Sequence, residues 1–464
     1  MKLKTQTFEI RSSPGSVGTV GFKEHSCEFF KRQYDKFKDK APAFGVFFFM
    51  QTSLAITDPE LIKEVFVRNF ESFHERGFFI NEQADPLSAH LFALGGQQWK
   101  ELRAKLSPTF TSGRMKMMFP LVVKAADRMV EYLMPYADNI EELEVKEVYA
   151  EFTTEVISSV AFGLDIPCLG NPDSEFRKVS KTLFEPTKLE NIKIMFIFAF
   201  PELAKGLNMR FIPKKSADFF MGVIRDTLEY REKNNVERND FLQLLINIRD
   251  TEGMTFNEIA ANSFIFFNAG FETSSSVMTF STYELALNQD IQERLRTEIN
   301  EVIAKNNGEI TYESIMEMKY LDMVFNETLR KYPIVDIQIR KSVKDFAIPN
   351  TNLVIPANTG IMIPVYAIHH DEKYYENPDK FDPERFTEEI VRKQLPYTFI
   401  PFSEGPRQCI GLRFGTMQAK IGIVKLVKNF KILPCSKTLI PMKYNPPSGF
   451  MSPLGGMWLK FEKL

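Results

Sequence analysis

Apolar residues with helical spacing dominate the chain. Residues 112–133 carry Met115, Val122 and Met129 among others on one helical face. Comparable signals predict further helices at about 147–162, 176–184, 216–233, 291–305 and 320–331. Strand-like runs are short, at 44–50, 54–56, 353–355 and 360–364. The pattern therefore predicts a mainly α protein with a smaller β region.

One predicted helix is unusually long. The capping box Thr255-x-x-Glu258 opens it, and it runs to about residue 288, roughly 50 Å at 1.5 Å per residue. Its middle, residues 264–276, contains glycine and hydroxyl side chains, which have low helix propensity. Such residues in the centre of a buried helix favour a functional site. A polar turn on a surface helix is the alternative interpretation.

A cysteine loop near the C-terminus carries the most distinctive chemistry. Residues 402–411 read F-x-x-G-x-R-x-C-x-G, with Cys409 just before an apolar helix predicted from about 410 to 430. Free N–H groups at a helix N-terminus favour thiolate over thiol, so Cys409 is a candidate nucleophile or metal ligand. The glycines allow a flat, bulky group to approach the backbone. A buried, inert cysteine is the alternative.

Composition narrows the possible functions. The 464 residues carry 58 basic and 60 acidic side chains, a net charge of −2, which gives no support for a nucleic-acid partner. The four cysteines form no C-x-x-C pair, which argues against a structural zinc site, and they are too sparse for a disulfide scaffold. The length alone predicts about three domains.

The cysteine loop resembles the haem-binding loop of the cytochrome P-450 superfamily, the haem-thiolate monooxygenases, at all five fixed positions. Further motifs of that family follow in its order: Trp99-x-x-x-Arg103, Ala269-Gly270-x-Glu272-Thr273-Ser274, Glu327-x-x-Arg330, and Arg385 in Pro-Glu-Arg-Phe. The phrases at 85–88, 102–112 and 327–333 are most similar to insect microsomal enzymes of the family-six type. The resemblance implies one P-450 domain over residues 1–464, with the long central helix over the haem.

The resemblance also assigns roles to individual residues. It implies haem b (iron protoporphyrin IX) with the Cys409 thiolate as its metal ligand. The haem propionates would be bound by Trp99, Arg103, Arg340 and Arg407. Proton delivery during oxygen activation would fall to the catalytic pair Thr273 and Glu272. The family's buried structural triad would be Glu327, Arg330 and Arg385.

The implied function is insertion of one oxygen atom into lipophilic substrates, with xenobiotics as the expected class. Electrons would come from NADPH–cytochrome P-450 reductase, with cytochrome b5 as a second partner, at a basic face near Arg413, Lys420 and Lys425. The substrate pocket would be lined near Phe92, Phe267, Ala269, Val335, Ile337, Phe450 and Met451. A haem-thiolate isomerase and a non-catalytic haem-binding protein are the alternatives; Glu272 and Thr273 argue against the isomerase. A metal role for the adjacent His369 and His370 is disfavoured, because neighbouring side chains point in different directions.

The expected location is the cytosolic face of the endoplasmic reticulum membrane. Residues 1–24 are polar, and no apolar run approaches the roughly 20 residues needed to span a bilayer. The family normally begins with a membrane helix and a proline-rich hinge, and we expect this chain to be a form without them. The apolar run from Ile194 to Phe200 is the expected site of peripheral membrane contact. Ser403, where the family commonly has glycine, is expected to be tolerated.

Overall fold

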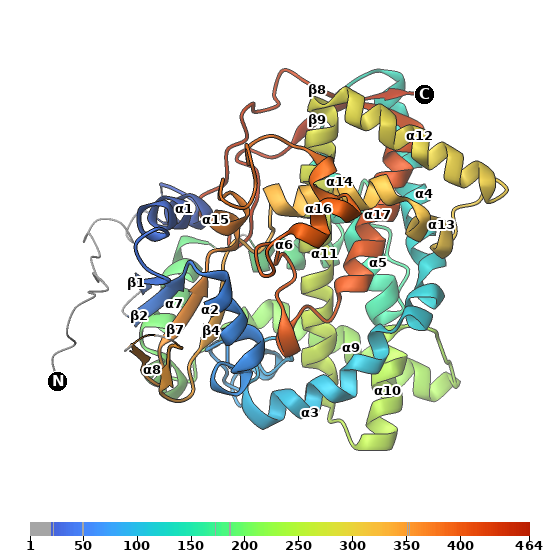
Figure 1. The fold of residues 1–464 in the computed structure, drawn as a ribbon. Coiled ribbons are helices and arrows are strands. Elements are labelled where there is room, and N and C mark those ends of the chain that lie inside the picture. The colour runs from blue at the N-terminus through green and yellow to red at the C-terminus, as the bar shows by residue number, and fades with distance from the viewer. Residues whose placement is uncertain are drawn as a thin grey trace.

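The computed structural model describes residues 20–21, 23–48, 51–171, 173–184, 187–349, 351 and 353–464. Helices make up most of this part of the chain (Figure 1). The α-helices are α1 (Ser26–Phe37), α2 (Pro59–Lys63), α3 (Gly96–Leu106), α4 (Ser112–Asp138), α5 (Val145–Phe162), α6 (Glu175–Phe184), α7 (Lys188–Ala199), α8 (Pro201–Gly206), α9 (Lys214–Asn234), α10 (Phe241–Glu252), α11 (Phe256–Leu287), α12 (Gln289–Lys305), α13 (Tyr312–Glu317), α14 (Lys319–Lys331), α15 (Val365–His369), α16 (Glu388–Lys393) and α17 (Leu412–Asn429). Short 3₁₀ or π segments lie at Glu64–Arg68, Phe70–Ser72, Pro86–Ser88, Ser107–Phe110, Pro383–Phe386 and Gly405–Arg407.

The strands form three small sheets. They are β1 (Ala43–Phe48), β2 (Gln51–Ile56), β3 (Glu142–Glu144), β4 (Gln338–Lys341), β5 (Phe346–Ala347), β6 (Val354–Ile355), β7 (Gly360–Ile363), β8 (Phe430–Pro434) and β9 (Trp458–Lys463). The sheet orders are β1-β2-β7-β4, β3-β9-β8 and β5-β6. Within the first sheet β2 runs parallel to β7, and β4 pairs antiparallel with β7, with Arg340 opposite Ile361. The predicted mainly α fold with a smaller β region is confirmed.

Local signals explain several helix boundaries. Thr255 and Glu258 form the predicted capping box at the start of α11. Gly163 ends α5 in the left-handed conformation, at φ +68°. The apolar run at 194–200 lies mostly in α7, and Pro201 then begins α8.

Two sequence predictions need adjustment. Helix α4 continues to Asp138, beyond the predicted end at residue 133, and includes Pro120 and Pro135. Residues 49–50 of the predicted strand at 44–50, and residues 1–19 of the polar N-terminal stretch, lie outside the described residues. The first adjustment reflects packing: Leu133 and Ala137 are both buried, so core contacts continue past the predicted end.

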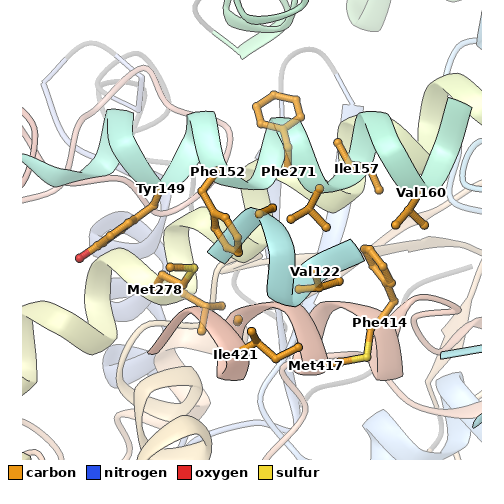
Figure 2. Packing of buried hydrophobic residues seen from close by; sticks show 14 of the residues in the cluster. Val122, Tyr149, Phe152, Ile157, Val160, Phe271, Met278, Phe414, Met417 and Ile421 are labelled. Carbon is orange, nitrogen blue, oxygen red and sulfur yellow. The ribbon is translucent and has the colours of Figure 1, made fainter. Parts of the chain in front are cut away.

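Helix α11 forms the centre of the core, with α5 and α17 beside it (Figure 1). Figure 2 shows side chains of α4, α5, α11 and α17 meeting between these helices. Gly270 permits close approach to α5, because a Cβ there would lie 2.6 Å from Ile157 Cδ1. On the other flank, Phe414 of α17 packs against Phe266, with ring centroids 5.5 Å apart. This packing fixes the first turn of α17, and so the cysteine loop before it, against the middle of α11.

Candidate functional site

The cysteine loop is held in shape by local backbone conformation. Gly405 adopts φ +72°, and a side chain there would collide with the Phe66 carbonyl. Ser403 also has a left-handed conformation, at φ +62°, which normally favours glycine. The loop closes through a hydrogen bond from Cys409 N to the Phe402 carbonyl, 2.9 Å long. The loop therefore places Cys409 just before α17, as the sequence predicted.

The Cys409 side chain is exposed. Even so, burial raises the pKa of its thiol, and the Gly411 N–H and the charges of Arg103 and Arg76 oppose that rise only in part. The thiol is therefore accessible although protein atoms surround it. The Gly411 N–H at the start of the helix does favour thiolate, as expected, but desolvation outweighs it in the protein chain by itself. A bound metal ion would reverse this balance, since a coordinating thiol is deprotonated.

Arginines from four separate segments gather around this loop. Arg103 Nη1 of α3 donates to the Gln408 carbonyl at 3.0 Å, and Arg407 Nη2 donates to the Leu94 carbonyl at 2.6 Å. Arg340 Nη2 of β4 donates to Ser403 Oγ at 2.9 Å. Arg76, in the loop after Phe70–Ser72, donates from Nη2 to the Arg407 carbonyl at 3.3 Å. The structure thus brings Arg103, Arg340 and Arg407 together. It adds Arg76, which no periodic pattern or motif identifies.

Some guanidinium nitrogens of this group have no partner. Arg407 Nε and Nη1 and Arg340 Nε are buried without a hydrogen-bond partner in the described part of the chain. Burial and the positive charges of neighbouring arginines together lower the pKa of Arg407 to about 9 and that of Arg76 to about 10; the charge of Glu75 opposes the change at Arg407 only in part. Burial, Arg76 and Arg407 hold the pKa of Arg340 well below its usual range. Buried charged groups are stabilised by partners of opposite charge, so these guanidinium groups favour the binding of an anion with more than one negative charge.

Trp99 supports the arginine cluster from α3. Its side chain is buried, and the Arg407 guanidinium carbon lies 4.2 Å from its ring centroid. Phe70 packs against the same indole, with ring centroids 5.4 Å apart. Trp99 and Arg103 share one face of α3, so this face meets the cysteine loop at both positions. Trp99 fixes the orientation of Arg407 through a cation–π contact.

One stripe of α11 is open although the helix is otherwise mostly buried. Ala269 is exposed, and Ile265, Gly270 and Thr273 are half-buried, whereas nearly all their helical neighbours are buried. Residues 265, 269 and 273 follow one another at intervals of four, so they share a face. Thr273 Oγ1 donates to the Ala269 carbonyl at 2.6 Å, which satisfies its hydroxyl within a continuous helix. The predicted polar middle of the helix is therefore an open face rather than a break.

Glu272 lies on a different side of α11 from Thr273. Its side chain is buried, and its Oε1 lies 3.5 Å from Lys146 Nζ of α5. The charge of Glu272 also acts on Arg177 of α6. The structure therefore does not bring the Glu272 carboxylate into direct contact with the Thr273 hydroxyl.

The structure brings together the predicted triad of Glu327, Arg330 and Arg385. Arg330 Nε and Nη2 donate to the two carboxylate oxygens of Glu327 at 2.7 and 2.8 Å, and both residues are fully buried. Arg385 Nε lies 3.5 Å from Glu327 Oε1, and Asp382 N donates to the same oxygen at 2.9 Å. The grouping of Glu327, Arg330 and Arg385 is confirmed.

Aromatic side chains pack around α11 and the segments beside it. Phe267 packs against Phe162 and Phe220, at centroid distances of 5.6 and 5.1 Å, and Phe184 lies 5.8 Å from Phe450. Of the residues predicted to line a substrate pocket, Phe92 and Ala269 are exposed, and Val335, Ile337 and Phe450 are half-buried. Phe267 and Met451 are instead fully buried, because both belong to the large apolar core.

Two other predictions concern charged or titratable side chains. The expected basic face is reduced, because Lys420 and Lys425 form ion pairs with Asp322 and Asp127, and Lys420 is buried. Arg413 remains exposed. The two histidines are engaged with the protein backbone: His369 Nε2 accepts from Ile400 N at 3.0 Å, and His370 Nδ1 lies 2.8 Å from the Tyr366 carbonyl.

The predicted haem fits these observations. The exposed Cys409 thiol would hold the haem iron, and the unpartnered guanidinium nitrogens of Arg340 and Arg407 would bind propionate. The open stripe of α11 would leave room beside a flat ring. Among the described residues, these guanidinium nitrogens have no partner that could take the place of the propionates.

Comparison with known proteins gives the same result. The cytochrome P450 family model matches residues 16–461. Cytochrome P450 6a2 of Drosophila melanogaster is 42% identical over 463 residues, covering 96% of this chain and 92% of that protein. Probable cytochrome P450 6a20 of the same organism is 44% identical over 95% of this chain and 90% of its own length. Cytochrome P450 6A1 of Musca domestica is 41% identical over 97% and 91%, respectively. The predicted resemblance to insect family-six enzymes is confirmed: this chain belongs to the cytochrome P450 family of monooxygenases, which bind haem b through a cysteine thiolate.

Proposed function

We propose that the protein is a haem monooxygenase that oxidises lipophilic xenobiotics, with electrons from NADPH–cytochrome P-450 reductase. The observation that carries this proposal is the pairing of an exposed Cys409 thiol with buried guanidinium nitrogens of Arg340 and Arg407 that have no hydrogen-bond partner in the described residues. Cys409 would hold the haem iron through its thiolate, and Arg103, Arg340 and Arg407 would bind the propionates, with Trp99 orienting Arg407. Arg76 joins this group, because its charge acts on both Cys409 and Arg407.

When bound, the haem supplies the oxygen-activating chemistry, in which electron donation from a thiolate ligand favours cleavage of the O–O bond. One oxygen atom enters the substrate, and the other leaves as water after taking two electrons and two protons. The chain must therefore deliver protons in a controlled way. Thr273, on the open face of α11, can release the Ala269 carbonyl and donate its hydroxyl hydrogen to that face.

Glu272 would resupply these protons through water. Its carboxylate is buried but lies beside Lys146, which is half-buried and so connects the interior with solvent. A chain of water molecules around α11 would be needed, because Glu272 and Thr273 face different sides of the helix. This arrangement separates the proton source from the reacting face and limits the entry of bulk water.

The aromatic cover favours an apolar substrate. Phe92, Phe184 and Phe450 are all at least partly accessible and come from three different segments. A face built from phenylalanine and Ala269 offers few hydrogen bonds, so binding would depend mainly on burial of apolar surface. Lipophilic xenobiotics fit this chemistry.

Peripheral attachment to the endoplasmic reticulum membrane, on its cytosolic face, is the proposed location. No helix in the described residues is both long and apolar enough to cross a bilayer. Large apolar side chains are nonetheless exposed along α7, α8 and the turn that follows: Leu189, Ile192, Met195, Phe200, Leu203 and Leu207. An exposed apolar surface of this kind suits insertion into the headgroup region.

The reductase and cytochrome b5 would approach the side where α3 and α17 flank the cysteine loop. Lys100 of α3 and Arg413 of α17 are exposed there and can meet acidic partners. We also propose that residues 1–464 form one catalytic domain, because a single apolar core includes residues from Cys27 to Phe461.

A reconstituted assay tests the function. The haem-loaded protein, purified reductase and NADPH are incubated with a set of lipophilic insecticides and plant toxins, and products are identified by mass spectrometry. We expect products that carry one oxygen atom from ¹⁸O₂. Haem-loaded protein that accepts electrons from the reductase but forms no oxygenated product from any of them would contradict the proposal and favour a non-catalytic haem protein.

A further inference from the structure

A buried cluster of metal-binding residue types lies at the start of α1, outside the haem site. His25 is the N-cap of α1, Cys27 lies in its first turn, and Asp336 comes from the segment between α14 and β4. Their exposed fractions are 0%, 1% and 4%. His25 Nδ1 lies 3.1 Å from Cys27 Sγ and 3.9 Å from Asp336 Oδ2, and the three ligand atoms all lie within 4.8 Å of one another.

We propose that His25, Cys27 and Asp336 bind a zinc ion. Imidazole, thiolate and carboxylate are the three ligand types that zinc takes in proteins. The separations place a common centre at most about 2.4 Å from the three atoms, close to zinc bond lengths of about 2.0–2.3 Å. A water molecule or the Ser26 hydroxyl, whose Oγ donates to Asp336 Oδ2 at 2.6 Å, completes a tetrahedral site.

The His25 ring is already oriented for this role. Its Nε2 lies 3.2 Å from the Phe450 carbonyl, which can only accept, so Nε2 carries the hydrogen and Nδ1 presents a lone pair to the cluster. A metal-binding histidine is commonly fixed in this way by a carbonyl on its other nitrogen. The same lone pair accepts from Cys27 N at 3.2 Å, and zinc would replace that hydrogen bond. Glu28 would still cap the helix, because its Oε2 accepts from His25 N at 3.0 Å.

Zinc would also balance the charge of its ligands. Its binding would release the thiol proton of Cys27, so that one thiolate and one carboxylate face the divalent ion.

The C-x-x-C pattern does not identify this zinc site, because His25 and Cys27 lie about 310 residues before Asp336 in the sequence. Zinc there would tie α1 to the Asp336 segment and, through His25, to the Phe450 carbonyl. Val335, Ile337 and Phe450 flank the proposed substrate face, so the ion would stabilise one wall of it. The zinc site does not depend on the proposed substrate or on turnover.

Zinc analysis and zinc K-edge X-ray absorption of the haem-loaded protein test the proposal, since the haem iron does not contribute at that edge. After loading with Zn²⁺ and dialysis, we expect about one zinc per chain, with one sulfur at about 2.3 Å and nitrogen or oxygen ligands at about 2.0–2.2 Å. Cys27→Ser should lose the sulfur signal. Cys168→Ser, at another buried cysteine, should keep it.

Three results would overturn the proposal. They are no zinc retained by the wild-type protein, a coordination sphere of nitrogen and oxygen alone, and a sulfur signal that persists in Cys27→Ser. The first two need only the wild-type protein, so the test stands even where a variant fails to fold.

Discussion

Removal of the Glu327 carboxylate is the perturbation with the largest expected effect on stability. Glu327→Ala would leave Arg330 fully buried, with its Nε and Nη2 stripped of their carboxylate partners. Asp382 N would also lose its acceptor. Breaking a buried ion pair by removing one partner costs about 3–5 kcal/mol. Because proteins are stable by only about 5–15 kcal/mol, this loss is a large fraction of the total.

A matched surface pair provides the control. Glu389 and Lys393 of α16 are 2.7 Å apart, like Glu327 and Arg330, but their side chains are 80% and 74% exposed. Glu389→Ala should change the free energy of unfolding by no more than about 1 kcal/mol. Urea denaturation of the haem-loaded proteins, followed by circular dichroism, measures both. Equal, small losses in the two variants would refute the argument that burial makes the triad structurally essential.

Three further predictions follow from the site and its surroundings. Arg407→Ala should weaken haem binding by about 10- to 100-fold, as expected for a lost charge-assisted hydrogen bond, without lowering the stability of the haem-free chain; unchanged affinity in a haem titration would contradict this. Thr273→Ala should divert NADPH electrons to hydrogen peroxide, whereas Thr279→Ala, a buried threonine on the same helix, should not; equal coupling in both removes Thr273 from proton delivery. Burial lowers the pKa of His369 to about 3, so below pH 6.5 the unfolded chain takes up a proton that the folded chain does not. As the pH falls from about 6.5 towards 3, the free energy of unfolding should therefore fall by up to about 1.4 kcal/mol per pH unit because of this histidine. His369→Gln should make this dependence on pH less steep; an unchanged dependence would show that His369 is not responsible for it.

Features determined by neighbouring residues were predictable from the sequence. The capping box of Thr255 and Glu258, the glycine that ends α5 at Gly163, and the proline that begins α2 at Pro59 act over a few residues, and the structure has all three. The cysteine loop was recognisable for the same reason, since its chemistry is contained in ten consecutive residues.

Features that depend on distant segments were not predictable in this way. Arg76 reaches the cysteine loop from a stretch without periodicity. The position of its side chain depends on how the segment that carries Arg76 packs against Phe92. Lys420 and Lys425 looked like surface charges because their partners, Asp322 and Asp127, are about 100 and 300 residues away. A serine by itself does not indicate the left-handed conformation of Ser403, although the glycine common there in the family is compatible with it; its hydroxyl accepts a hydrogen bond from the distant Arg340.

The central claim is that Cys409 is the thiolate ligand of the haem iron. The carbon-monoxide difference spectrum of the reduced, haem-loaded protein tests it most directly, because thiolate ligation shifts the Soret band of the complex to the red. We expect that shifted band in the wild-type protein and its loss in Cys409→His, which can still bind haem. An unshifted band in haem-replete wild-type protein, or a shifted band that survives in Cys409→His, would contradict the claim.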